Sequence, residues 1–114
     1  MRIDVLTVFP EMFTPVLSAG VVGKAIAKGL ADIYTHDLRD YAHDRHRSID
    51  DSPFGGGPGM VMRTEPLFEA IETVRSTPGS PVVVLSPQGS PFNQRTAERF
   101  AALDSVTLVC GRYE

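Results

Sequence analysis

Apolar residues follow two spacings that alternate along this chain. Four short runs of β-branched and aromatic residues have the character of strands, and the segments between them repeat apolar residues at helical spacing. The strand-like runs are residues 3–9, 33–38, 82–85 and 106–110, and the helical segments are residues 11–18, 21–28, 66–75 and 93–103. This alternation predicts an α/β domain with a largely parallel sheet.

Single residues refine the ends of these elements. Pro10 suits the start of the first helix, because its fixed φ and missing N–H fit a first helical turn. Gly29 is expected to end the second helix, and Thr64 to cap the third. The run at residues 82–85 is wholly apolar, which is typical of a strand buried on both faces.

The stretch from residue 39 to residue 63 has neither a helical nor a strand period, which is typical of a functional or disordered segment. Its second half is rich in glycine: Gly55, Gly56, Gly57 and Gly59, with Pro58 among them. The run lacks the Lys-Ser/Thr of a phosphate-binding P-loop and the spacing of a dinucleotide-binding motif. Glycine loses much backbone entropy on folding, so a run of glycines needs a structural reason. The run at residues 55–59 predicts either a bent backbone that touches a flat ligand or a hinge or lid. A linker exposed to solvent is the alternative.

Length, charge and cysteine content limit the class of protein. The 114 residues match one domain, and 42% hydrophobic with 22% charged residues excludes disordered and fibrous classes. Eleven Lys and Arg against fourteen Asp and Glu give a formal charge of −3, which argues against a globally basic coat for nucleic acid but not against a local patch. The sequence has one cysteine, so no internal disulfide is possible. It has no apolar run of membrane length and no secretory signal, so the expected location is the cytoplasm.

Two loops follow strand-like runs in positions where α/β sheets bind ligands. Residues 86–89 read SPQG and follow one buried run, and residues 111–114 read GRYE and follow the next. Since the carboxyl ends of parallel strands meet at one edge, these loops are expected to converge on one pocket, although two ordinary turns stay open. A buried strand followed only by a glycine turn also predicts that these residues are the front of a longer protein.

The other reactive side chains favour plainer interpretations. His36, His43 and His46 lie among aspartates, but their spacing matches no helical zinc pair, so a solvated charged loop is favoured over a metal site. The same segment holds Arg39, Arg45 and Arg47, the place where the sequence would invite RNA phosphates, although interleaved aspartates weaken that interpretation. Cys110 is interpreted as an apolar core thiol rather than a nucleophile. The sequence pattern alone therefore predicts a pocket shaped by glycines for a small molecule, and it does not identify a reaction.

Three longer motifs carry a resemblance to a known family. Residues 50–60 read DDSPFGGGPGM, residues 85–89 read LSPQG and residues 110–114 read CGRYE. FPEMF at residues 9–13 and the stretch from Gly23 to Gly29 agree as well. In this order and spacing, and over the whole chain, the motifs resemble the bacterial tRNA (guanine-N1)-methyltransferases that act at position 37.

The resemblance implies a SPOUT-type fold: a largely parallel sheet with helices on both faces, trefoil-knotted in full-length members. It implies that residues 1–114 are the N-terminal S-adenosylmethionine-binding domain, with the rest of the knot and the C-terminal tRNA-binding domain absent. The implied cofactor-binding residues are Leu85, Ser86, Pro87, Gly89, Gly111, Tyr113 and Glu114. The implied substrate-binding residues, close to the target guanine, are Gly55, Gly56, Gly57, Pro58, Gly59 and again Glu114.

The activity that the resemblance implies is transfer of a methyl group from S-adenosylmethionine to N1 of guanosine 37 in tRNA. Guanine N1 carries a proton at neutral pH, so a general base must remove it, and the guanine must leave the base stack. The family's aspartate and arginine in these roles lie beyond Glu114, so no catalytic residue is assigned here and the 114 residues alone are expected to be inactive. A homodimer, binding of the tRNA anticodon region and assistance by Mg²⁺ are further expectations, with no metal-binding residue assigned.

Two other functions stay open. The chain is alternatively a non-catalytic module that binds S-adenosylmethionine or RNA, or an α/β subunit whose loops pack against a partner. Saturable cofactor binding without methyl transfer would favour the first, and a stable hetero-complex without cofactor binding would favour the second.

Overall fold

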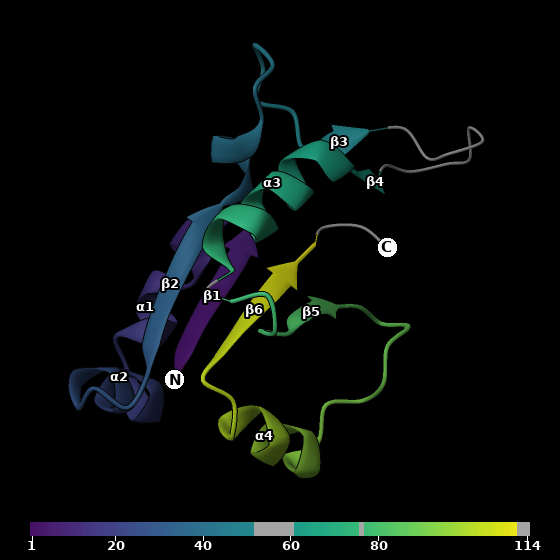
Figure 1. Ribbon diagram of the computed structural model, residues 1–114. Coiled ribbons are helices and arrows are strands. Elements are labelled where there is room, and N and C mark those ends of the chain that lie inside the picture. Colours follow the sequence, from purple (N-terminus) through teal and green to yellow (C-terminus); the bar gives the residue numbers. More distant parts are fainter. Residues whose placement is uncertain (52–60, 76, 112–114) are drawn as a thin grey trace.

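A parallel sheet forms the centre of the molecule. The computed structural model describes residues 1–51, 61–75 and 77–111. Four strands in these ranges pair in the order β2-β1-β6-β5, and every pair is parallel, as the alternating pattern predicts (Figure 1). The strands are β1 (Arg2–Thr7), β2 (Asp32–Asp37), β5 (Val82–Leu85) and β6 (Ser105–Cys110). Because they run in one direction, their carboxyl ends all face the same edge of the sheet.

Helices and one small hairpin fill the connections. The 3₁₀ turn η1 (Pro10–Met12) and helices α1 (Thr14–Leu17) and α2 (Gly20–Ala27) join β1 to β2, and α4 (Gln94–Ala101) joins β5 to β6. Between β2 and β5 lie η2 (Leu38–Tyr41), the antiparallel strands β3 (Asp50–Asp51) and β4 (Val61–Met62), and helix α3 (Thr64–Val74). Part of the stretch predicted to be irregular is therefore ordered into η2 and this hairpin. None of the described helices has the length and apolar character that crossing a bilayer requires.

Two helix predictions are wrong in detail. The single helix expected at residues 11–18 is divided into η1 and α1. Pro15 lies in the first turn of α1, and because proline has no N–H, a continuous helix through this position would lack one backbone hydrogen bond. Thr64 is the first residue of α3 rather than its cap, and Arg63 precedes it in extended conformation. Asn93 does cap α4, since its side-chain oxygen accepts a hydrogen bond of 2.9 Å from the Thr96 N–H.

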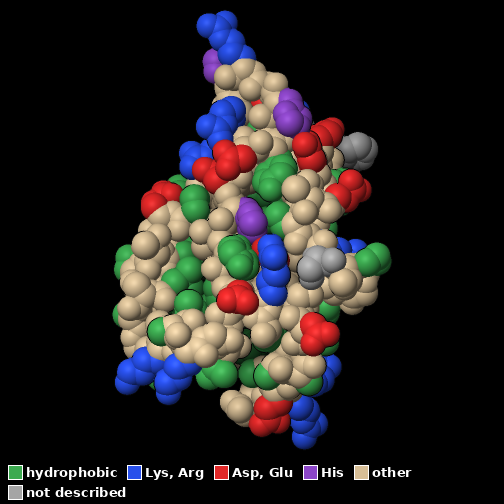
Figure 2. Space-filling model, turned by 60° about the vertical axis from the view of Figure 1, so that its left-hand side comes forward, with side chains coloured by type: hydrophobic (Ala, Val, Ile, Leu, Met, Phe, Trp, Pro, Cys, Tyr) green, Lys and Arg blue, Asp and Glu red, His purple; other side chains and the backbone are tan. Residues whose placement is uncertain are grey.

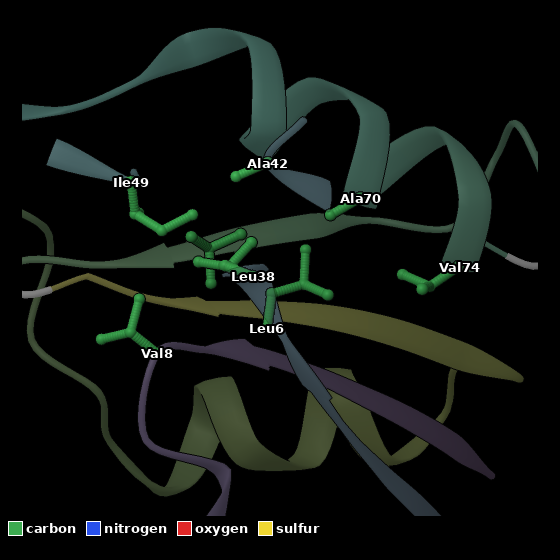
Figure 3. Packing of buried hydrophobic residues seen from close by; sticks show 8 residues of the cluster. Leu6, Val8, Leu38, Ala42, Ile49, Ala70 and Val74 are labelled. Atoms are coloured by element: carbon green, nitrogen blue, oxygen red, sulfur yellow. The ribbon is translucent and has the colours of Figure 1, made fainter. Parts of the chain in front are cut away.

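The main core lies between the sheet and α3. Leu6 of β1 and Val109 of β6 are fully buried and pack with Ala70 and Val74 of α3, and Leu38 of η2 closes the cluster (Figure 3). Fully burying an aliphatic side chain contributes about 1.5–3 kcal/mol, so this cluster anchors α3 to the middle strands. The remaining members of the cluster are Val8, Ala42 and Ile49.

Helix α4 lies on the opposite face of the sheet from α3, as Figure 3 shows. Side chains alternate between the two faces of a strand, so Val106 and Leu108 point away from the side that Val109 shares with α3. Val106 and Leu108 face Ala97 and Phe100 of α4 across an apolar cavity of about 400 Å³. The described helices thus cover both faces of the sheet.

Strand β5 contradicts the prediction that it is buried on both faces. Val84 is 61% exposed and Leu85 is 54% exposed. Among the described strands β5 pairs only with β6, so it occupies an edge of the sheet. Its wholly apolar sequence is typical of a central strand, but neighbours in the folded chain, not the sequence of a strand, decide how far it is buried.

Two glycines explain the motif that begins at Gly23. A Cβ at Gly23 would lie 2.8 Å from the backbone carbonyl carbon of Ser18, so the start of α2 and the end of α1 approach too closely for a side chain. Gly29, which follows α2, has a φ of +76°, a conformation that side chains other than glycine rarely adopt. Both glycines are therefore needed for the conformation of the helical connection between β1 and β2.

Replacing Gly23 by alanine is expected to destabilise the fold. The added Cβ meets backbone rather than a side chain that can move, and overpacking of this kind costs about 1–3 kcal/mol. Urea unfolding followed by circular dichroism measures the change. Gly79→Ala is the matched control, because nothing lies within 4 Å of its Cβ. Equal stability of the Gly23→Ala variant and the parent would contradict the tight approach of α1 and α2.

Candidate functional site at the carboxyl edge of the sheet

The loops after β5 and β6 begin side by side. The register pairs Leu85 with Cys110, so Ser86 and Gly111 are the first residues beyond neighbouring strand ends. In open parallel sheets this edge is where ligands bind. The register therefore agrees with the prediction that the two loops start from one edge.

A cavity of about 540 Å³ adjoins the loop after β5. Its volume lies within the range of about 300–1,000 Å³ that is typical of small-molecule sites. Its walls come from the end of β5, the following loop and one side of α4, namely Val83, Val84, Leu85, Ser86, Pro87, Gly89, Ser90, Pro91, Phe92, Thr96, Arg99 and Phe100. Four of these, Leu85, Phe92, Phe100 and Val83, also line the apolar cavity under α4, so the two spaces adjoin.

The loop after β5 is a compact turn. The Gly89 N–H donates to the Ser86 carbonyl oxygen at 3.3 Å, and the Gln88 N–H donates to Ser86 Oγ at 3.0 Å. A Cβ added at Gly89 would meet only that carbonyl oxygen, at 3.6 Å, which is ordinary van der Waals contact. The described part of the chain therefore leaves room for a side chain at Gly89.

The structure describes five of the residues predicted to form the site. Leu85, Ser86, Pro87 and Gly89 line the cavity, and Gly111 lies exposed at the adjacent strand end without lining it. The others lie outside the described residues: Gly55, Gly56, Gly57, Pro58, Gly59, Tyr113 and Glu114.

Sequence reasoning did not find the contribution of α4 to this cavity. Phe92, Thr96, Arg99 and Phe100 all line it, and the rings of Phe92 and Phe100 lie 6.2 Å apart. Thr96, Arg99 and Phe100 lie on one side of α4, and Phe92 lies in the loop just before this helix. From the sequence, this segment was predicted only as a helix at residues 93–103.

At the same edge of the sheet, a charged loop extends from the end of β2. Arg39 donates three hydrogen bonds to Asp37, from its backbone N–H at 2.9 Å and from Nε and Nη2 at 3.1 Å each. Partial burial opposes ionisation of the Asp37 carboxyl, but the Arg39 contacts outweigh it and lower the pKa of Asp37. Arg39 Nη2 also donates to the Val8 carbonyl oxygen at 3.1 Å, which ties this loop to the end of β1.

We call residues 42–48 the tip; it is the loop at the top of Figure 1. Arg47 Nη2 lies 2.5 Å from a carboxylate oxygen of Asp40. Hydrogen bonding from the Ser48 side chain and from the Ser48 N–H lowers the pKa of the Asp44 carboxyl, and Arg63 Nη1 lies 3.5 Å from this carboxyl. Figure 2 shows cationic, acidic and histidine side chains mingled at this end of the molecule. The aspartates thus neutralise much of the basic charge, as the interleaved sequence indicated.

Two of the three histidines contact carboxylates. His43 Nε2 lies 2.6 Å from Glu69 of α3, and His36 Nε2 lies 2.8 Å from the buried Asp4, which also binds Arg2. Within the described ranges, no group of three or more His, Cys, Asp or Glu side chains is arranged to hold a metal ion. These carboxylates were not predicted from sequence, because Asp4 and Glu69 lie far along the chain from the histidines they contact.

Cys110 ends β6 and is partly buried. Burial raises the pKa of its thiol. The thiol is therefore protonated at neutral pH, which agrees with a core residue rather than a nucleophile.

Comparison with known proteins identifies the family. The family model of tRNA (Guanine-1)-methyltransferase TrmD matches residues 1–114. The chain belongs to this family.

Similar proteins named tRNA (guanine-N(1)-)-methyltransferase occur in distant bacteria. The one from Chloroflexus aggregans is 50% identical over 116 residues, and that from Moorella thermoacetica is 48% identical over 119 residues. Each alignment covers all of this chain but only 46% and 47% of the respective relative. The chain therefore spans about half the length of the curated relatives it matches.

The Asp37–Arg39 contact predicts a dependence of stability on acid pH. Because the folded-state pKa of Asp37 is lowered, its contribution is complete above the unfolded value of about 3.9 and is lost as the pH falls through the folded pKa. At pH 7, Asp37→Asn is expected to unfold at a lower urea concentration than the parent. Its free energy of unfolding should be lower by on the order of 1 kcal/mol. Urea titrations between pH 7 and pH 3 should show this difference shrinking toward the acid end. A difference independent of pH would contradict the role of the ionised carboxylate.

Proposed function

We propose that this chain carries the S-adenosylmethionine site of an enzyme that methylates N1 of guanosine 37 in tRNA. The observation that carries the proposal is the cavity of about 540 Å³ at the carboxyl edge of the sheet, in a chain of the tRNA (Guanine-1)-methyltransferase family. Leu85, Ser86, Pro87 and Gly89, proposed as cofactor residues, all line this cavity.

The described residues fit such a cofactor in size and chemistry. The walls from β5 and α4 offer apolar surface for a planar base, and the loop offers hydroxyl and backbone groups for a sugar and an amino acid. The absence of a side chain at Gly89 leaves space beside the turn, since no chain atom comes nearer than 3.6 Å to its missing Cβ. Gly111, Tyr113 and Glu114 are proposed to complete the site from the neighbouring strand end.

The chemistry of methyl transfer assigns separate roles to the cofactor and to the residues around it. When bound, S-adenosylmethionine supplies a methyl group activated by its sulfonium. The turn at residues 86–89 would hold and orient the ligand, and the aromatic side chains Phe92 and Phe100 would exclude water from its apolar side. Removing the proton from guanine N1 needs a general base, which we assign to no residue of this chain. Gly55, Gly56, Gly57, Pro58 and Gly59, together with Glu114, are proposed to lie near the target guanine.

The remaining family properties are part of the same proposal. They are a SPOUT-type knotted fold in which residues 1–114 are the N-terminal domain, a homodimer, the anticodon region of tRNA as partner, Mg²⁺ assistance and a cytoplasmic location. The open side of β5 supports a fold in which further chain contacts the sheet, because Val84 and Leu85 are more than half exposed there.

A second candidate is a module that binds S-adenosylmethionine, or packs with a partner, without catalysis. The cavity that supports cofactor binding is common to both candidates, so cofactor binding and methyl transfer have to be measured separately.

Cofactor binding is tested by titrating S-adenosylmethionine into the protein in a calorimeter. We expect saturable binding that Gly89→Ala weakens about tenfold, or 1.4 kcal/mol, because the added methyl group occupies space in the cavity. The thermal unfolding midpoint should stay unchanged, since the chain leaves room for this Cβ. Gly79→Ala, in the turn before β5, is the matched control and should bind as the parent does. Equal affinity of all three proteins would contradict the proposed site.

Methyl transfer is tested with radiolabelled S-adenosylmethionine and tRNA transcripts that carry G37 or A37. The 114 residues alone are expected to bind the cofactor and transfer no methyl group, and a chain of the length of its relatives is expected to methylate G37 and not A37. Transfer by the 114 residues would overturn the first expectation. Failure of the longer chain to transfer would favour the non-catalytic module.

A further inference from the structure

Ion pairing leaves one arginine of the charged segment without a partner. Arg39, Arg45, Arg47 and Arg63 are the four arginines between residues 39 and 63. Three of them are paired: Arg39 with Asp37, Arg47 with Asp40 and Arg63 with Asp44. Arg45 is exposed, and nowhere in the described part of the chain does it find a hydrogen bond or an ion pair. Its positive charge is the one that these three aspartates leave uncompensated.

The tip that carries Arg45 is held in a defined conformation. The Arg47 N–H donates to the Asp44 carbonyl oxygen at 3.1 Å, and the Ser48 N–H donates to the Asp44 side chain at 2.8 Å, so a turn closes around Arg45. Arg47 within this turn has a φ of +51°, and its Nε donates to the Arg39 carbonyl oxygen at 3.2 Å. A cation on a preorganised turn loses less conformational entropy on binding than one on a free loop.

The hairpin and α3 brace the tip from its two sides. Arg63, directly after β4, reaches Asp44 at 3.5 Å and donates to the Ser48 carbonyl oxygen at 3.4 Å. His43 contacts Glu69 of α3 at 2.6 Å. These contacts pair the charges at the base of the tip, and Arg45 is the arginine of the tip that has no ion pair among the described residues.

The position of the tip indicates what meets this cation. It follows β2 at the carboxyl edge of the sheet, the edge at which Ser86 and Gly111 begin (Figure 1). If the target base reaches the proposed cofactor site, the neighbouring tRNA backbone lies close to this edge, and its phosphates are anions that an arginine binds well.

We propose that the tip, residues 42–48, is a contact surface for the backbone of the tRNA substrate, and that Arg45 binds one of its phosphates. The contact positions the RNA and reads no sequence, because phosphate is the same at every nucleotide. This proposal rests on the proposed function, since it takes tRNA as the partner.

The test measures tRNA affinity against salt concentration by filter binding, with the chain at the length of its relatives and a G37 transcript. Arg45→Ala is expected to weaken binding about 5- to 8-fold at 0.1 M salt and to lower the slope of log K against log salt by about one, as for loss of one phosphate contact. Arg45→Lys should restore most of the tRNA affinity and most of the salt slope, because a lysine also binds phosphate as a point charge. The affinity for S-adenosylmethionine should not change in either variant.

Arg95→Ala is the matched control for the loss of a positive charge. Arg95 is an exposed arginine on α4, which lies at the bottom of Figure 1, away from the tip. If Arg45→Ala and Arg95→Ala weaken binding equally, the effect is one of net charge and the proposed contact is wrong. If Arg45→Ala binds as the parent does, the proposal is wrong while the proposed function stands. If the parent itself binds no tRNA, both fail.

Discussion

The parallel pairing of β1 with β2 on one side and β6 on the other is the constraint on which the rest of the structure depends. It places Leu6 and Val109 side by side on the face that α3 covers, and both are fully buried there. Parallel strands also need crossover connections, and the described helices of these connections lie over both faces of the sheet. The parallel pairing brings all the carboxyl ends to one edge, where the turn at residues 86–89, Gly111 and the charged tip are found together.

The two halves of this edge differ in character. Around β5 and α4, apolar side chains together with Ser86, Thr96 and Arg99 line a cavity of about 540 Å³, a size that suits a small molecule. Beyond β2 the surface is charged and paired, and Asp37, Asp40 and Asp44 hold three arginines in fixed positions. One edge of the sheet therefore carries a cavity on one side and a loop of paired charges on the other.

Much of the fold could be predicted from the sequence because apolar periodicity is a local property. The four strands of the sheet and helices α2, α3 and α4 lie within a few residues of their predicted positions. Of the predictions that were wrong, the division of the first helix has a local cause in Pro15, whereas the exposure of β5 at the sheet edge depends on which strands lie beside it. For the site, the turn at residues 86–89 was predicted and its cavity is present, whereas the contribution of Thr96 and Arg99 from α4 was not foreseen.

The sequence by itself determined the alternation of strands and helices, the family and the glycine positions at Gly23 and Gly29, because each depends on residues near one another in the chain. The tertiary structure alone decided which carboxylate each cation meets. Asp4 binds His36 across two strands, and Arg63 reaches back to Asp44, pairs separated by many residues and joined only once β1 and β2 pair and the hairpin folds against the tip. Charges act over short distances in space, so which cation remains uncompensated is a property of the folded chain and not of its sequence order.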